Sequence, residues 1–176
     1  MPDTRLVIVD PGHFHAALVQ KEMYANLSAE AHVYAPLGAE LIDYLGRIAR
    51  FNAHPDQPTC WRLVVHAALD FQAQLAQEPP GGVAVIAGRN RPKIERIAAA
   101  VEAGLHVIAD KPAIIRREDL PRLAAVLDMA EERRLVVCDL MTGRQDVITR
   151  LIRLLREDPE VFGKLLPAVP PSPGSG

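Results

Sequence analysis

Six short apolar runs, each followed by a longer stretch with helical periodicity, constrain the fold of this chain more than any other feature. The runs are rich in Val and Ile and are apolar on successive residues, which is typical of strands covered on both faces. They span residues 6–9, 32–35, 63–66, 83–87, 106–109 and 135–138. This alternation predicts an α/β fold, a three-layer doubly wound parallel sheet of about six strands with helices on both faces.

The last three helical stretches have apolar stripes at i, i+3, i+4 and i+7 spacing, which predicts one buried face on each helix. In chain order the predicted stripes are Ile94, Ile97, Ala98 and Val101; Leu120, Leu123, Ala124 and Leu127; and Val147, Ile148, Leu151, Ile152 and Leu155. Residues 51–61 contain two prolines and predict an irregular loop. We expect residues 1–165 to form the folded domain, and residues 166–176, rich in Pro, Ser and Gly, to form a disordered tail.

Charge and composition exclude several classes of protein. The formal net charge is −2 with acids and bases interspersed, so the chain has no basic stripe for nucleic acid and no membrane-surface helix. No apolar run reaches the roughly 18 residues that a bilayer requires, and the N-terminus does not resemble a signal peptide. Cys60 and Cys138 lie far apart and are expected to be free thiols. These features predict a cytoplasmic protein.

In an open parallel sheet the ligand binds beyond the carboxyl ends of the strands, so the residues that follow each strand are the candidate site. The first strand is followed by "DPGHFH", residues 10–15, where a dinucleotide-binding fold has Gly-x-Gly-x-x-Gly. Gly12 keeps the position at which a side chain would block the approach of a diphosphate. Asp10 and His15 replace the first and third glycines, so the turn has the expected position but keeps only one of the three glycines of this motif.

The segment "VAVIAGRNRPKIERIAAAVEAGLHVIADKPAII", residues 83–115, resembles the N-terminal Rossmann domain of the Gfo/Idh/MocA oxidoreductases. Asn90 matches the asparagine of that family's turn after the fourth strand, while Gly88 and Arg89 replace its threonine and proline. Lys111 and Pro112 match its Glu-Lys-Pro motif, with an aspartate, Asp110, in place of the glutamate. The later "FGKL", residues 162–165, resembles the entry to that family's second domain, so the similarity extends from Arg5 to Leu165.

This resemblance implies a domain that binds NAD or NADP, with no preference between them, in an oxidoreductase that transfers a hydride to or from a sugar-like or polyol-like alcohol. Lys111 would be the catalytic residue, because partial desolvation disfavours its ammonium form, and the lysine could then polarise or deprotonate a hydroxyl. The candidate cofactor-binding residues are Gly12, His13, Phe14, His15, Gly88, Asn90, Asp110 and Pro112. A small-molecule substrate is the expected second ligand.

Several charged residues near the turn keep alternatives open. The carboxylate of Asp10 would repel a diphosphate unless it were paired or protonated. Glu40 and Asp43 follow the second strand, where the default interpretation is a solvated helix face. Arg89 and Arg91 are either phosphate contacts or surface charges.

The histidines of the turn have several possible roles. His13 and His15 could donate hydrogen bonds to phosphate, contact substrate or form a simple Asp–His turn. A metal site made by Asp10, His13 and His15 is conceivable in an extended turn. No established metal-binding spacing supports it, so no metal is predicted.

Other function classes also stay open. In the family that this chain resembles, a second domain supplies the substrate wall, and the chain ends before one, so we expect an incomplete catalyst as an isolated chain. The chain would then be a truncated reading frame or a fragment of a longer oxidoreductase; alternatively, a partner chain or a homo-oligomer would cover its open face. The alternatives are a non-catalytic nucleotide or ligand sensor, and a phosphoacceptor receiver domain suggested only by Asp10 and Lys111.

Overall fold

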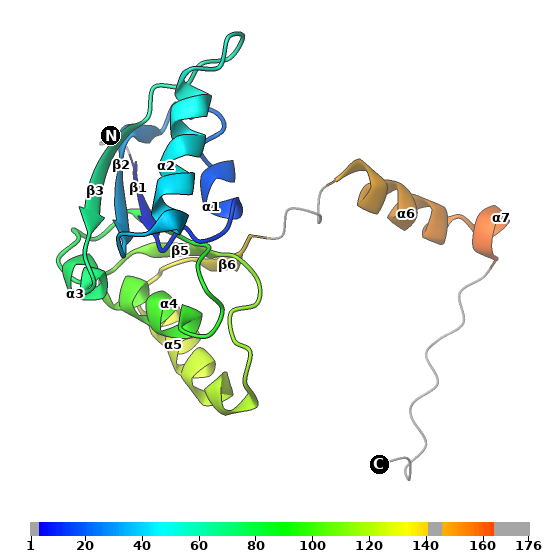
Figure 1. Ribbon diagram of the computed structural model, residues 1–176. Coiled ribbons are helices and arrows are strands. Elements are labelled where there is room, and N and C mark those ends of the chain that lie inside the picture. Colours follow the sequence, from blue (N-terminus) through cyan, green and yellow to red (C-terminus); the bar gives the residue numbers. More distant parts are fainter. Residues whose placement is uncertain (1–3, 141–145, 164–176) are drawn as a thin grey trace. The chain divides into compact units, whose positions relative to one another are not determined.

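The computed structural model describes residues 4–140 and 146–163 and divides the chain into two compact units, Met1–Leu140 and Met141–Gly176 (Figure 1). The predicted tail, residues 166–176, and the predicted domain end at residue 165 lie outside the described residues, and both stay predictions. Within the described ranges, no helix is both long enough and apolar enough to cross a membrane.

The first unit is a six-stranded parallel sheet, as predicted. Its strands are β1 (Thr4–Val9), β2 (Leu27–Ala35), β3 (Arg62–Ala67), β4 (Val83–Ile86), β5 (His106–Ala109) and β6 (Val137–Asp139). They lie side by side in the order β3-β2-β1-β4-β5-β6, which is the doubly wound Rossmann arrangement. Receiver domains have the five-strand order 2-1-3-4-5, so the phosphoacceptor alternative is wrong at the level of the fold.

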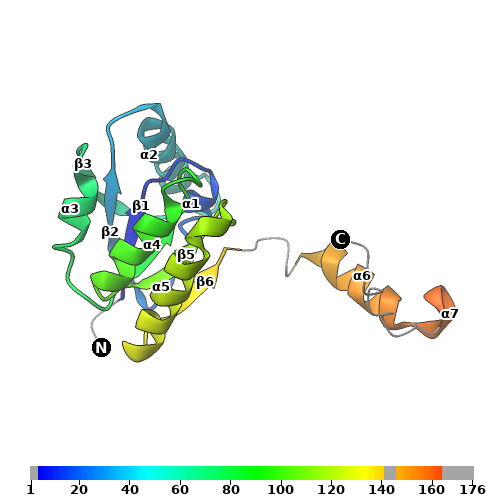
Figure 2. The ribbon, with the colours of Figure 1, turned by 90° about the horizontal axis from the view of Figure 1, so that it is seen from below.

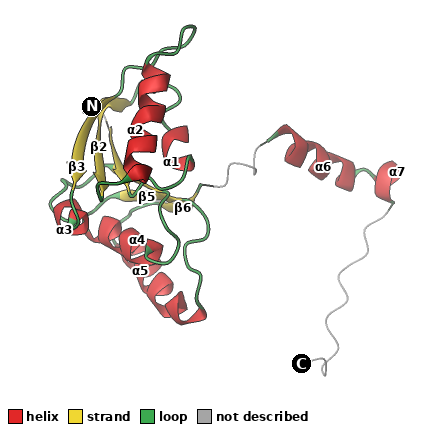
Figure 3. Ribbon diagram, viewed as in Figure 1, coloured by secondary structure: helices red, strands yellow, loops and turns green. Residues whose placement is uncertain are grey.

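Five helices cover the two faces of the sheet (Figures 2 and 3). They are α1 (His15–Leu18), α2 (Ala39–Asn52), α3 (Phe71–Leu75), α4 (Lys93–Glu102) and α5 (Leu120–Glu132). Alternate side chains of β1 enter opposite cores: Leu6 and Ile8 pack with α1 and α2, whereas Val7 and Val9 pack with α3, α4 and α5. A strand buried on both faces has no polar side for water, which explains its continuous apolar sequence.

The predicted stripe of α4 is confirmed, and that of α5 is wrong in part. Ile94, Ile97, Ala98 and Val101 are all buried. On α5 the buried residues are Val126 and Ala130, whereas Leu120 and Leu127 are exposed and only Leu123 of the predicted stripe packs partly against the core. The helix contacts the sheet near its edge strand, so a narrow face suffices and the outer leucines stay in water.

In the second unit, the described residues 146–163 form two helices, α6 (Val147–Glu157) and α7 (Pro159–Phe162). Asp146 caps α6 because its side chain accepts a hydrogen bond from the Thr149 backbone N–H at 2.8 Å. The five residues of the predicted α6 stripe are on one side of an amphipathic helix, as expected, but none is buried. The expected cover for this stripe stays a prediction.

The parallel strands place their carboxyl ends along one edge of the sheet. The chain order reverses between β1 and β4, and at this switch point the two following loops diverge and leave a crevice. The loops after β1 and β4 border the crevice, and the loop after β5 lies next to them. These are the three loops that carry the residues named from the sequence.

Candidate functional site

The turn after β1 is built around Asp10, which is buried and has a positive φ of 48°. The Gly12 backbone N–H donates a hydrogen bond to the Asp10 carbonyl oxygen at 2.7 Å, which closes the turn. The Asp10 carboxylate accepts hydrogen bonds from the Arg96 guanidinium and, at 3.2 Å, from the Arg89 backbone N–H. The expected repulsion of a diphosphate by Asp10 is therefore removed by pairing.

Position 88 requires glycine because the Asp10 carboxylate occupies the space that a side chain would need. A side chain at Gly88 would overlap the Asp10 carboxylate and bring its Cβ within 2.6 Å of the Asp10 carbonyl oxygen. The loops after β1 and β4 are therefore joined by the close approach of Gly88 and by the hydrogen bond from the Arg89 backbone N–H to Asp10, while the ion pair with Arg96 ties the turn to α4. Arg96 also lies over the ring of Phe71, with 5.6 Å between its Cζ atom and the ring centroid, which fixes the guanidinium in the core.

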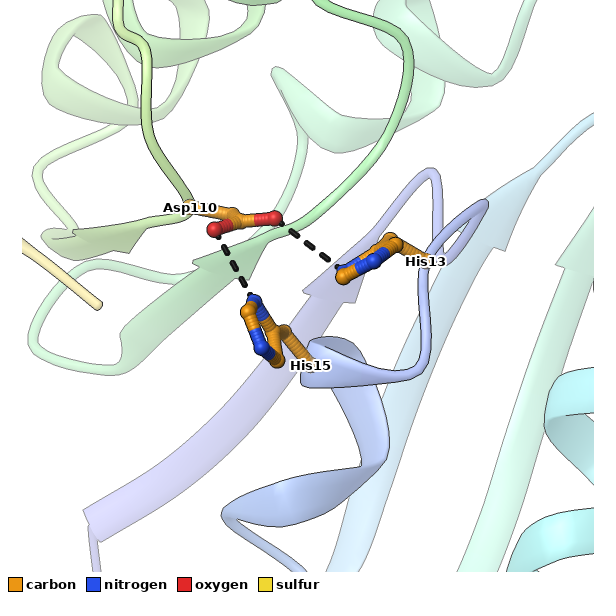
Figure 4. A group of neighbouring side chains, drawn as sticks. All are labelled: His13, His15 and Asp110. Carbon is orange, nitrogen blue, oxygen red and sulfur yellow. Dashed lines mark hydrogen bonds and ion pairs between the residues drawn. The ribbon is translucent and has the colours of Figure 1, made fainter. Parts of the chain in front are cut away.

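At the other side of the crevice, His13 and His15 converge on Asp110 (Figure 4). The His15 Nδ1 atom lies 3.0 Å from Asp110 Oδ1, and the His13 Nδ1 atom lies 3.2 Å from Asp110 Oδ2. The two imidazole rings meet edge to face, with 4.4 Å between their centroids. His15 and Asp110 are buried, whereas the His13 side chain is 43% exposed.

This environment changes the pKa values of the group. Burial and the neighbouring His15 lower the pKa of His13 below its ordinary value of 6.5, against the opposite effect of Asp110. Burial alone would raise the pKa of Asp110, but the His15 hydrogen bond and the charges of His15, Lys111 and Lys93 outweigh it and lower the pKa. At neutral pH the group is thus a carboxylate beside a neutral His13.

Two lysines contact Asp110 in different ways. The Lys111 ammonium lies 3.6 Å from Asp110 Oδ1, and its side chain is 57% exposed. The expected desolvation of Lys111 is therefore not found. The buried lysine is Lys93, which donates hydrogen bonds to Asn90 Oδ1 at 2.7 Å and to the Asp110 carbonyl oxygen at 2.9 Å. Burial lowers the pKa of Lys93.

Most of the predicted site residues line one cavity. A cleft of about 260 Å³ is lined by Gly12, His13, Gly88, Arg89, Asn90, Asp110 and Lys111. Gly12 and Lys111 thus border the same space, as the predicted coenzyme position requires. His15 lies beneath it, Phe14 is 46% exposed with its ring 4.4 Å from those of His13 and His15, and Pro112 follows a cis peptide bond at the exposed rim.

A second cavity, of about 390 Å³, extends from Asp10 and Arg89 past the end of β2 to the start of α2. It contains Glu40, which the sequence pattern assigned to a solvated face. Glu40 instead reaches back over the turn: a Cβ on Gly12 would lie 3.5 Å from its carboxylate, and Arg89 donates hydrogen bonds to it at 3.3 and 3.4 Å. Asp43 is exposed and bonds only Arg47 one helical turn away, as a solvated face predicts.

Sequence reasoning did not assign three residues to the site: Glu40, Lys93 and Arg96. The two basic residues belong to α4, where they lie at i and i+3 beside the apolar stripe of Ile94 and Ile97. Charged residues flanking a buried stripe are a usable signal that their head groups are paired inside the protein. Nothing in the local pattern distinguishes Glu40 from its solvated neighbours.

No family model and no curated protein matches the chain. Among solved structures it is similar to a "putative oxidoreductase" from Parabacteroides merdae ATCC 43184, with 37% identity and a TM-score of 0.88 over 96% of this chain and 38% of that protein. Two more distant structures share the fold. One is myo-inositol 2-dehydrogenase from Lactobacillus plantarum, with 14% identity and a TM-score of 0.62 over 90% of this chain and 42% of that one. The other is biliverdin reductase from Synechocystis sp. PCC 6803, in complex with biliverdin and NADP+, with 14% identity and a TM-score of 0.61 over 88% of this chain and 42% of that one.

The chain therefore spans about two fifths of the length of the proteins that it matches. Three observations indicate the same N-terminal domain: the sequence identity to the Parabacteroides protein, the strand order of the sheet, and the partial coverage of the matched proteins. The chain belongs with the N-terminal Rossmann domains of Gfo/Idh/MocA-type oxidoreductases.

Proposed function

We propose that this chain is the NAD(P)-binding domain of an oxidoreductase that transfers a hydride between the nicotinamide and an alcohol carbon of a sugar-like or polyol-like substrate. The observation that carries the proposal is the shared cleft of Gly12, Gly88, Asn90 and Lys111 at the switch point of the sheet. Among the similar folds, one is a myo-inositol 2-dehydrogenase and another is a complex with NADP+, which is consistent with the proposal, although both share only the fold with this chain.

The residues present fit a dinucleotide. Gly12 keeps a side chain off the turn that faces the cleft, and Gly88 makes room for the Asp10 carboxylate behind it. The two carboxylates near the turn are both paired, Asp10 with Arg96 and Glu40 with Arg89, which reduces their repulsion of a diphosphate. Gly12, Arg89 and Asn90 would hold the diphosphate side, while His13, Asp110 and Pro112 would border the nicotinamide side. When bound, the coenzyme supplies the hydride acceptor or donor.

Lys111 is the group that would handle the hydroxyl proton. Its Nζ atom is held beside Asp110 Oδ1, and its exposed side chain can reach a substrate in the cleft. In carbonyl reduction the Nζ ammonium would give its proton to the substrate oxygen, and in alcohol oxidation the neutral Nζ amine would accept the hydroxyl proton. Asp110 would orient it, and the buried Lys93 would hold the Asp110 backbone in place.

The open cleft favours a catalyst that is incomplete as an isolated chain. The Lys111 side chain is 57% exposed, so water reaches the place where the substrate would react. Hydride transfer needs two reactants that are oriented and shielded from water. We therefore expect nucleotide binding with little turnover. A non-catalytic nucleotide sensor would give the same binding, and it would differ by showing no alcohol oxidation when a substrate-binding partner is supplied.

Calorimetric titration of the full chain with NAD(H) and NADP(H) tests the proposal. We expect one site per chain and at least a tenfold loss of affinity in Gly12→Ala, because a methyl group would stand where the backbone approaches the diphosphate. The added Cβ makes only ordinary contacts of 3.5 to 3.6 Å, so the fold should persist.

Gly46→Ala, in the middle of α2 and outside both cavities, is the matched control and should bind as the parent does. Absence of binding by the parent chain, or equal binding by Gly12→Ala, would overturn the proposal.

A further inference from the structure

The convergence of two imidazoles and a carboxylate on one point has a use beyond nucleotide binding. We propose that His13, His15 and Asp110 form a site for a divalent transition-metal ion of the Zn²⁺ type. The sequence led to the expectation of no metal, because it has no established metal-binding spacing. The carboxylate of this group comes from the end of β5, 95 residues away from His15. Asp10, the acid considered first, is occupied by Arg96 and does not belong to the group.

The spacing of the donor atoms suits a metal. One donor atom from each residue lies within 4.8 Å of the other two. The His15 Nδ1 atom faces Asp110 Oδ1 at 3.0 Å and the His13 Nδ1 atom faces Asp110 Oδ2 at 3.2 Å, so the two imidazoles lie against different oxygens of one carboxylate. Each separation is close to the roughly 3.0–3.4 Å between adjacent ligands whose bonds to the metal are about 2.0–2.2 Å long. An ion between the imidazoles and the carboxylate would take the place of these direct contacts.

The donor set also indicates the class of metal. Two imidazole nitrogens and one carboxylate oxygen are the ligands of Zn²⁺ and neighbouring first-row ions, whereas Ca²⁺ and Mg²⁺ prefer oxygen alone. His15 and Asp110 are buried and held by packing, so little ordering is needed on binding.

A contrasting cluster shows why the same contact elsewhere carries no such inference. His32 Nδ1 also lies 3.0 Å from a carboxylate oxygen, that of Glu78. The oxygens of Glu78 are already used by Arg5 at 3.0 Å and by the Tyr34 hydroxyl at 2.6 Å. In that cluster one imidazole contacts a carboxylate whose oxygens already accept hydrogen bonds from other donors. We therefore interpret it as a structural cluster and not as a metal site.

The site would face the cleft with an open position. His13 is the exposed member of the group, and both His13 and Asp110 line the cleft beside Lys111. Three protein ligands and one accessible position are the pattern of metal sites that bind water or a substrate oxygen. The competing cation is the Lys111 ammonium, 3.6 Å from Asp110 Oδ1, and its exposed side chain can move away.

Titration of the metal-free full chain with Zn²⁺, in the absence of nucleotide, tests the proposal independently of cofactor binding. The chain should carry no histidine tag and should have both exposed cysteines changed, Cys60→Ser and Cys138→Ser, to exclude thiolate ligation. Calorimetry gives the stoichiometry, and the visible absorption of bound Co²⁺ reports nitrogen and oxygen ligation.

We expect one ion per chain and an affinity loss of at least about tenfold in His13→Ala and in Asp110→Asn, since even residues behind the ligands have effects of this size. Lys111→Met should bind more tightly, because the competing charge is gone. His54→Ala, at an exposed histidine in the loop after α2, is the control and should bind as the parent does.

Circular dichroism verifies folding, and His13→Ala keeps the test decisive because His13 is partly exposed and its loss should not unfold the chain. Absence of one-to-one binding, or binding that His13→Ala leaves unchanged, would overturn the proposal. Zn²⁺ binding without nucleotide binding would reject only the proposed function, and nucleotide binding without Zn²⁺ binding would reject only this inference.

Discussion

Asp10 and Asp110 follow two parallel strands of one sheet, β1 and β5, and both are almost completely buried. Their partners differ. Asp10 is bound by the guanidinium of Arg96 and a backbone N–H, all inside the protein. Asp110 is contacted by two imidazoles and the ammonium of the exposed Lys111, of which His13 and Lys111 line the cleft.

The difference indicates a structural role for Asp10 and makes Asp110 the candidate for a role in chemistry. A fixed buried guanidinium saturates its partner and leaves no open position, so Asp10 holds the loops after β1 and β4 together. Imidazoles and an exposed lysine can exchange protons, release the carboxylate or admit a ligand. Burial alone therefore does not distinguish the two carboxylates, whereas the chemistry of their partners makes Asp110 the candidate for a functional role.

The largest expected effect is that of Asp10→Asn, which should lower the free energy of unfolding by about 3–5 kcal/mol. The Arg96 side chain is only 10% exposed, and it would keep a buried charge without a counter-ion. Asparagine tolerates the positive φ of this position, so the change isolates the lost charge.

Urea unfolding followed by circular dichroism measures the effect of Asp10→Asn. Asp43→Asn, in an exposed i,i+4 pair with Arg47, is the control and should stay within about 0.5 kcal/mol of the parent. If Asp10→Asn costs less than about 1 kcal/mol, the structural role of this carboxylate is refuted.

Asp110→Asn should have an intermediate effect, a loss of about 1–2 kcal/mol in the free energy of unfolding. The amide oxygen can still accept one hydrogen bond, and water can solvate the exposed His13 and Lys111. The same urea experiment measures it. A loss as large as that of Asp10→Asn would mean that both carboxylates are structural and would remove the contrast.

Arg89→Gln should have the smallest effect, below about 1 kcal/mol, because its ion pair with Glu40 is exposed and solvated. Arg96→Gln provides the comparison, since it removes the buried partner of the same turn and should cost several times more. A loss above about 2 kcal/mol for Arg89→Gln would place its side chain in the structural network rather than at the mouth of the cleft.

Much of the fold could be predicted from the sequence, since all six strands and the α4 stripe follow from local apolar patterns. The α5 stripe could not, because a helix at the sheet edge buries only part of the face that its sequence offers. The candidate site was also predictable in its location: Gly12, Asn90 and Lys111 come together because the carboxyl ends of parallel strands share an edge.

The partners within the site were not predictable. Arg96, 86 residues from Asp10, supplies the charge that makes the turn compatible with a diphosphate. Glu40 looks like a solvated helix residue in the sequence, and only the folding of α2 against the turn brings it over Gly12. Pairings of this kind depend on long-range geometry, which a local pattern does not contain.

By itself, the sequence determined the alternation of buried strands and helices, and hence the parallel sheet with its edge of strand-end loops. The tertiary structure alone decided which carboxylate is saturated and which stays open to the cleft. The physical reason is that apolar periodicity acts over a few neighbouring residues, whereas the state of a buried charge is set by whichever cations and imidazoles the completed fold brings within hydrogen-bonding distance.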